Sequence, residues 1–91
     1  MKRPNPEQTK RLRAELIDDV EAGRIDIGTA TRKMRKILGM NRHEYAENVA
    51  KIGFETLQAV ETGKGNPTIN TLRAIGAPFG FDVGFVRNNK R

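Results

Sequence analysis

Apolar positions along this chain recur mainly at the three- and four-residue spacing of amphipathic helices. A first helix is predicted from Pro6, a residue suited to the first helical position, to a point near Gly23. After the short connection 24–27 a second helix follows, for which either Asp26 or Thr29 supplies the N-cap. Gly39 is its natural end. The inward positions of the two helices are Leu12, Leu16, Ile17, Val20, Ala30, Met34, Ile37 and Leu38.

The same spacing predicts three more helices. Asn41 caps the third, with Glu44 three residues later as in a capping box. Gly53 opens the fourth helix and Gly63 ends it, and Thr68 caps the fifth. Their inward positions are Tyr45, Ala46, Val49, Leu57, Val60, Ile69, Leu72 and Ile75.

The period changes at the end of the chain, where Phe81, Val83 and Phe85 alternate with other residues as in a strand. A lone strand has no sheet to join, so we expect it to pair with the same strand of a second copy in an antiparallel ribbon. The alternative is an irregular tail packed on the core. The predicted fold is therefore an all-α five-helix bundle with a short C-terminal β-strand that pairs across a dimer.

Composition narrows the class of protein. The 91 residues are enough for one domain. They include no cysteine, which excludes disulfides and thiolate metal sites. No apolar run is long enough to span a membrane, so a cytoplasmic location is expected. The chain has no serine, and its one histidine, His43, is interpreted as a polar residue near a helix start. We therefore expect no enzyme activity, no catalytic or metal site and no cofactor.

The formal net charge of +6 favours a polyanionic partner. The charge is also unevenly distributed. Acidic residues gather in the first helix. A block without acids follows in the second helix and just after it, and it consists of Arg32, Lys33, Arg35, Lys36 and Arg42.

Several segments appear in a specific order between Ile27 and Gly80. They are Gly39-Met40-Asn41, Tyr45-Ala46-Glu47, Leu57 and the run Val60-Glu61-Thr62-Gly63-Lys64-Gly65-Asn66-Pro67-Thr68. In this order and spacing the chain resembles the Xre/Cro family of phage-repressor-like helix-turn-helix proteins, which bind double-stranded DNA. The ending 78–86 is similar to a subgroup that includes persistence-type antitoxins, in which a C-terminal strand pairs across the dimer. The resemblance divides the chain into a basic arm with the N-terminal helix (1–26), a helix-turn-helix domain (27–80) and a dimerisation strand with a basic tail (81–91).

The resemblance also implies which residues contact DNA. The helix that begins at Phe54 would enter the major groove. Its base-reading positions are Phe54, Glu55, Thr56, Gln58 and Ala59. Phosphate contacts are implied for Asn41, Arg42, Thr62, Lys64 and Asn66. Two assignments have alternatives: Phe54 is either a base contact or a core residue, and Glu55 is either a base contact or a negative residue near a helix N-terminus.

Arg35 and Glu61 match a pair that forms a partly buried ion pair in the family. The turn between the third and fourth predicted helices, which form the helix-turn-helix motif, departs from the family pattern. The interval from Tyr45 to Glu61 is one residue longer than usual, and Ala50 and Lys51 stand where a glycine is common. Counting back from Glu61 leaves Ile52 as the buried turn residue and Gly53 as the helix cap.

The function expected from these features is that of a homodimeric repressor or autoregulator at an inverted-repeat operator. The alternatives are an antitoxin that neutralises a protein toxin and autoregulates its operon, and an adaptor that binds only proteins. Phe81, Val83 and Phe85 would form the dimer contact. The N-terminal helix would cover the core, enlarge the dimer interface or recruit another protein.

Overall fold

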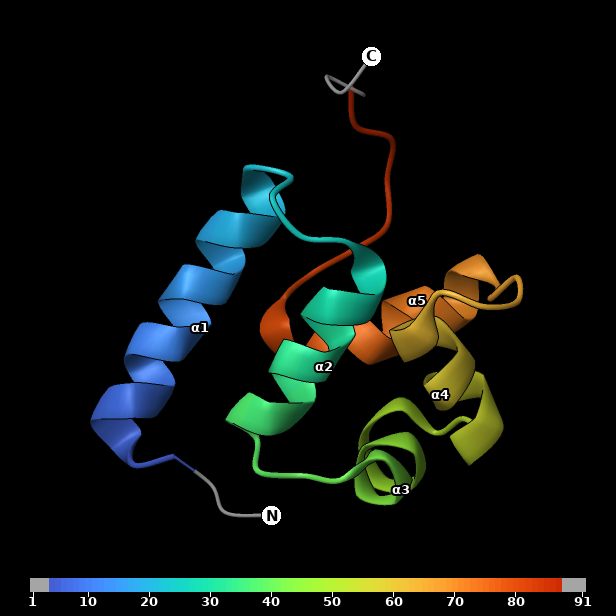
Figure 1. Ribbon diagram of the computed structural model, residues 1–91, viewed down its shortest axis with the longest axis horizontal. Helices are drawn as coiled ribbons and strands as arrows, with labels where there is room; N and C mark the ends of the chain where they lie inside the picture. Colours follow the sequence, from blue (N-terminus) through green and yellow to red (C-terminus); the bar gives the residue numbers. More distant parts are fainter. Residues whose placement is uncertain (1–3, 88–91) are drawn as a thin grey trace.

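The computed structural model describes residues 4–87, and all regular secondary structure in this range is helical (Figure 1). The all-α prediction is therefore confirmed. Predicted features at the chain ends, Lys2 and Arg3 of the basic arm and the basic tail beyond residue 87, lie outside the described residues. The elements are α1 (Pro6–Glu21), α2 (Ile27–Ile37), α3 (Arg42–Glu44), the π-helix η1 (Tyr45–Ala50), α4 (Phe54–Thr62), α5 (Ile69–Gly76) and the 3-10 helix η2 (Ala77–Phe79).

The helix starts follow the polar residues that the sequence places before them. Asp26, and not Thr29, caps α2, because its carboxylate accepts the Thr29 backbone N–H at 2.8 Å. Asn41 and Glu44 form the predicted capping box, in which each side chain accepts the other residue's backbone N–H. Thr68 caps α5 with its hydroxyl oxygen, which accepts the Thr71 backbone N–H at 3.1 Å. These local hydrogen bonds satisfy amides that a helix leaves free at its first turn.

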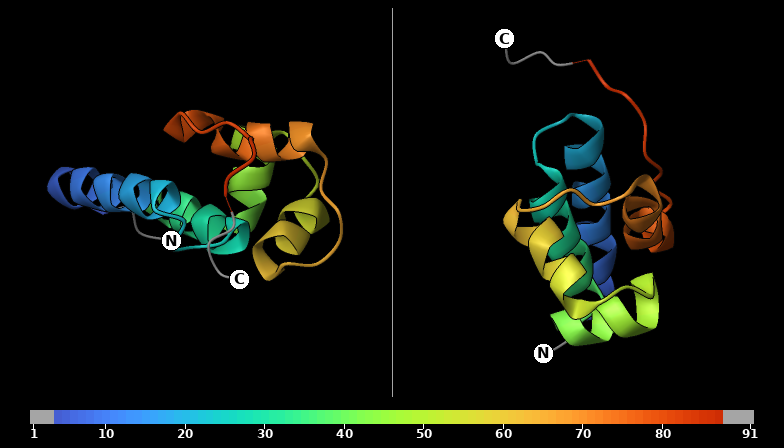
Figure 2. Two further views of the ribbon diagram at one scale, coloured as in Figure 1. Left: turned by 90° about the horizontal axis from the view of Figure 1, so that it is seen from above. Right: turned by 90° about the vertical axis from the view of Figure 1, so that its right-hand side faces the viewer.

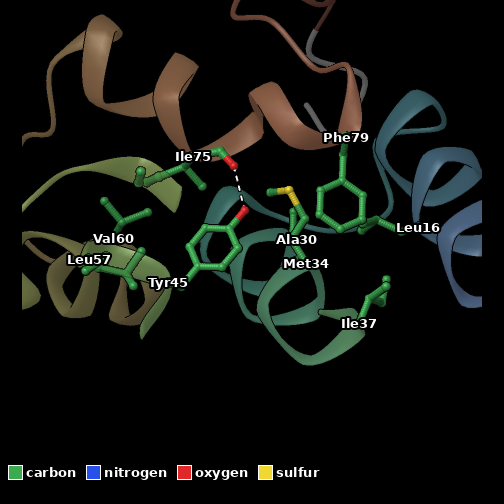
Figure 3. Packing of buried hydrophobic residues seen from close by; sticks show 11 residues of the cluster. Leu16, Ala30, Met34, Ile37, Tyr45, Leu57, Val60, Ile75 and Phe79 are labelled. Carbon is green, nitrogen blue, oxygen red and sulfur yellow. Dashed lines mark hydrogen bonds between the residues drawn. The ribbon is translucent and has the colours of Figure 1, made fainter. Parts of the chain in front are cut away.

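The core lies between α2 and the remaining helices, and α1 closes one side of it (Figures 1 and 2). Leu16 of α1 is 1% exposed, so this helix covers the core whatever else it does. Tyr45 is fully buried and donates its hydroxyl to the Ile75 carbonyl at 2.7 Å (Figure 3). Burial raises the pKa of Tyr45 to about 12. Its phenol therefore stays neutral and joins η1 to α5.

One predicted core position is wrong. Ile69 is 57% exposed, whereas Leu72 is half-buried and Ile75 is buried on the same helix. Ile69 is the first residue of α5, and a helical side chain leans toward the turn that precedes its own Cα. Here that turn is the exposed loop 63–68, so the side chain extends past the edge of the core.

A close approach of two backbones sets the position of α4. A Cβ added to Gly28 of α2 would lie 2.7 Å from the Glu61 carbonyl oxygen and 2.9 Å from that of Val60. Only glycine lets the start of α2 approach the end of α4 so closely. The C-terminal end of α4, the helix expected to enter the major groove, is thus packed tightly against the start of α2.

Residues 81–87 form an extended segment, and no strand is present in the described chain. Phe81 is half-buried and stacks on Phe79 with ring centroids 6.4 Å apart. Phe85 and Val86 are fully exposed. The predicted strand stays a prediction, because it requires a partner strand that a single chain does not supply. Within residues 4–87, no helix combines the length and the apolar character needed to cross a membrane.

Candidate nucleic-acid interface

Helix α4 has two unlike faces. Leu57, Val60 and Glu61 point into the molecule and are buried. The other face carries most of the residues predicted to read bases. Glu55, Thr56 and Gln58 are exposed, and Ala59 and Phe54 are half-buried. Figure 2, right, looks toward the side on which α4 lies, with the turn before it and the loop after it at its two ends.

Glu61 anchors the inner face of α4 through two arginines. Arg35 of α2 donates from Nε to Glu61 Oε2 at 2.8 Å and from Nη2 to Oε1 at 3.0 Å. Its third nitrogen, Nη1, donates to the Met40 carbonyl at 3.2 Å. The Glu61 side chain is fully buried, and the forked contact matches the two carboxylate oxygens. The ion pair that the sequence suggests is therefore present, and it ties α4 to α2.

Arg42 is the third member of this cluster. The family resemblance implies a phosphate contact for this residue. Its Nε donates to Glu61 Oε1 at 3.1 Å, while its side chain is 31% exposed. Burial acts to raise the pKa of Glu61, but the hydrogen bonds from Arg35 and Arg42 outweigh it and hold that pKa below its usual range. Arg42 is thus oriented by Glu61 and keeps its two terminal nitrogens for another acceptor.

The other residues predicted to contact phosphate differ in how they are held. Asn41 is exposed and uses its side-chain oxygen in the cap of α3, which leaves its amide nitrogen as a donor. Thr62 donates its hydroxyl back to the Gln58 carbonyl at 2.9 Å, so a phosphate contact would require that hydrogen to turn away. Lys64 and Asn66 are exposed in the loop after α4.

A shallow groove of about 290 Å³ brings two predicted sets of residues together. One wall is the outer face of α4 and the other is the loop that follows it. Its lining residues are Glu55, Thr56, Ala59, Val60, Lys64, Asn66 and Pro67. Candidate base contacts and candidate phosphate contacts therefore share one surface, although they are separate in the sequence.

Phe54 is neither a core residue nor a free side chain. Its ring stacks on that of His43, with centroids 3.9 Å apart and planes at 10°. The pair joins the first turns of α3 and α4 on the outside of the molecule. Sequence reasoning missed this role of His43, because the two residues lie on different helices and no periodicity links them.

The longer turn is built by a π-helix. Lys51 and Ile52 both donate their backbone N–H to the Ala46 carbonyl, so η1 holds the extra residue before the chain turns. Lys51 then adopts the left-handed conformation, with φ 56° and ψ 46°. This conformation costs a non-glycine residue roughly 1–2 kcal/mol. Ile52 packs against the core and Gly53 caps α4, as the sequence predicts.

The basic block seen in the sequence is divided in the structure. Arg35 is buried in the ion pair with Glu61, and Lys33 lies 3.7 Å from an Asp19 oxygen of α1. Arg32 donates to the Glu61 backbone carbonyl at 3.4 Å. Three of the basic side chains of α2 thus contact acceptors within the protein.

No family model, curated protein or solved structure matches this chain. The resemblance to helix-turn-helix proteins therefore rests on the sequence motifs alone and stays a prediction. Within residues 4–87 there is also no group of three histidine, cysteine or acidic side chains arranged to hold a metal ion.

Proposed function

We propose that this chain is a sequence-specific double-stranded DNA-binding regulator that acts as a homodimer. The observation that carries the proposal is the outer face of α4. Its polar residues Glu55 and Thr56 line one groove with Lys64 and Asn66, while Glu61 holds its inner face through two ion pairs. Exposed polar groups on a well-anchored helix suit the reading of base edges in the major groove.

In this proposal α4 enters the major groove with its first turns toward the bases. Glu55 accepts from a cytosine amino group, and Phe54 and Ala59 contact thymine methyl groups. Asn41 and Arg42 bind the backbone at one end of the motif, and Lys64 and Asn66 bind it from the loop at the other. The phosphate contacts fix the register of α4 without reading sequence.

The proposed dimer uses the extended segment at the end of the described chain. Phe85 and Val86 are exposed, and residues 81–87 form no strand within the described chain, so in this proposal a second copy supplies the partner strand. An antiparallel ribbon would relate two α4 helices by a two-fold axis. Their half-sites would then lie about 34 Å apart, or a multiple of that.

Selection of bound sequences from random duplex DNA tests the proposal. We expect an inverted repeat, and binding to the selected duplex should weaken steeply with salt. If each dimer neutralises about 8 phosphates, the logarithm of the affinity falls with the logarithm of salt concentration at a slope of about −7. Failure to retain any duplex at low salt would rule out DNA binding and favour a protein partner, such as a toxin.

A variant separates dimerisation from folding. Phe85→Asp should reduce the sedimenting mass to that of a monomer, because a charge cannot enter an apolar interface at low cost. Ile69→Asp is the matched control, since Ile69 is also an exposed apolar residue but lies outside the proposed ribbon. A wild-type protein that sediments as a monomer at all concentrations would contradict the dimer.

A further inference from the structure

Lys51 combines three properties. It has a left-handed backbone, it is exposed, and it forms none of the ion pairs found within residues 4–87. It occupies the turn directly before the cap of α4. A residue of this kind is a cation held in a costly conformation without a protein partner.

A glycine would meet the structural demand of this turn at less cost. Glycine adopts the left-handed region without a steric penalty, and five glycines of this chain do so. A positive charge at the C-terminal end of η1 is favoured by the helix dipole, which offsets part of the cost of lysine. Residues with a strained backbone are concentrated at functional sites, so the conformation of Lys51 suggests that its side chain has a function.

The place of Lys51 indicates what it binds. The turn lies at the N-terminal end of α4, opposite the end where the loop carries Lys64 (Figure 2, right). A helix lying in the major groove runs between two phosphate backbones, and cations at its ends can reach them.

We infer that Lys51 is an additional phosphate-binding residue, which holds the DNA backbone at the N-terminal end of α4. The inference rests on the proposed function and adds to it a contact that the family resemblance does not supply. Its ammonium group acts as a point charge and carries no sequence information.

The test measures stability and DNA binding on the same variants of the full chain. The probe is a short mixed-sequence DNA duplex, since phosphate contacts supply nonspecific affinity. Lys51→Gly should raise Tm by roughly 2–6 °C, because the backbone strain is removed. It should also weaken binding roughly 3- to 10-fold at about 0.1 M salt and reduce the salt slope by about 0.9 per protomer.

Three further variants separate the charge from the backbone. Lys51→Gln should weaken binding to the same degree without raising Tm, and Lys51→Arg should bind as the wild type does. Lys10→Gln removes a charge from an exposed position of α1 and should leave the salt slope unchanged.

Wild-type affinity and slope in both Lys51→Gly and Lys51→Gln would overturn the inference while leaving the proposed function intact. An equal loss of slope in Lys10→Gln would also overturn it, because the effect would then reflect net charge and not a contact. A wild-type protein that does not bind the duplex at all would reject the proposed function, and the inference with it.

Discussion

Two glutamates on α4 show how differently one helix uses the same side chain. Glu61 is 3% exposed and holds two arginines, one from α2 and one from α3. Glu55 lies six residues earlier on the outer face, is exposed, and lines the groove with Lys64 and Asn66. The inner carboxylate fixes where α4 lies, whereas the outer one is left for a partner.

The difference shows that a charged residue of this protein indicates function only once its burial and its ion-pair partners are known. The basic block of α2 is the most conspicuous charge feature of the sequence, yet Arg35 lies in the interior and Lys33 approaches α1. The proposed DNA contacts instead use cations near the two ends of α4. Four experiments test the contrast between its inner and outer faces.

The largest effect is expected from Glu61→Ala. Removing the carboxylate leaves the buried Arg35 and the partly exposed Arg42 without a counter-charge, and breaking a buried pair costs about 3–5 kcal/mol. The value should fall toward the lower end, because Arg42 can turn its partly exposed side chain to water. Chemical denaturation measures the loss. Glu47→Ala, at an exposed position of η1, should change the unfolding free energy by less than about 0.5 kcal/mol. Equal losses would mean that the buried cluster does not anchor α4.

Acid should weaken the same anchor by a smaller amount, because a protonated carboxyl keeps an acceptor oxygen. The pKa of Glu61 is lower in the folded protein than its ordinary value of 4.5, so the unfolded chain binds the proton more readily. The stabilisation is therefore complete above about pH 4.5 and is lost as the pH falls through the folded pKa. The difference in unfolding free energy between wild type and Glu61→Gln should shrink over that range. A constant difference would argue against an ionised Glu61.

Gly28→Ala should destabilise the protein through the backbone of the inner face. The new methyl group would meet two carbonyl oxygens of α4 at less than 3.0 Å, and neither can move without shifting that helix. We expect a loss of about 1–3 kcal/mol, as for other overpacked sites, despite the better helix propensity of alanine. Lys36→Ala, at an exposed position of α2, is the control and should change stability by less than about 0.5 kcal/mol. A wild-type Tm for Gly28→Ala would show that α4 can shift without cost.

Glu55→Gln should have the smallest effect on stability and the clearest effect on DNA. Its side chain is exposed, so the unfolding free energy should change by less than about 0.5 kcal/mol. Repeating the selection from random duplexes should alter the preferred base at one position of each half-site, worth about 1–3 kcal/mol of discrimination. An unchanged selected sequence would assign Glu55 to the helix N-terminus and not to base reading.

The sequence alone was sufficient for the features that arise within a few residues. Helix starts could be predicted at Asn41 and Thr68, because each capping side chain accepts from an amide only three positions later. The apolar spacing identified most of the core for the same reason. It was wrong at Ile69, because periodicity describes the direction of a side chain and not what lies beyond the helix end.

Only the tertiary structure decided the features that join distant segments. Arg42 reaches Glu61 across nineteen positions, and Phe54 stacks on a histidine of another helix. The interval from Tyr45 to Glu61 showed that the turn has one extra residue. The length of an interval does not tell whether a loop or a helix contains that residue. The fold places it in η1, because the buried Ala46 and Ala50 keep the backbone helical until Lys51 turns it toward α4. Local hydrogen bonds can be read along a chain, whereas such packing depends on which surfaces the whole chain brings together.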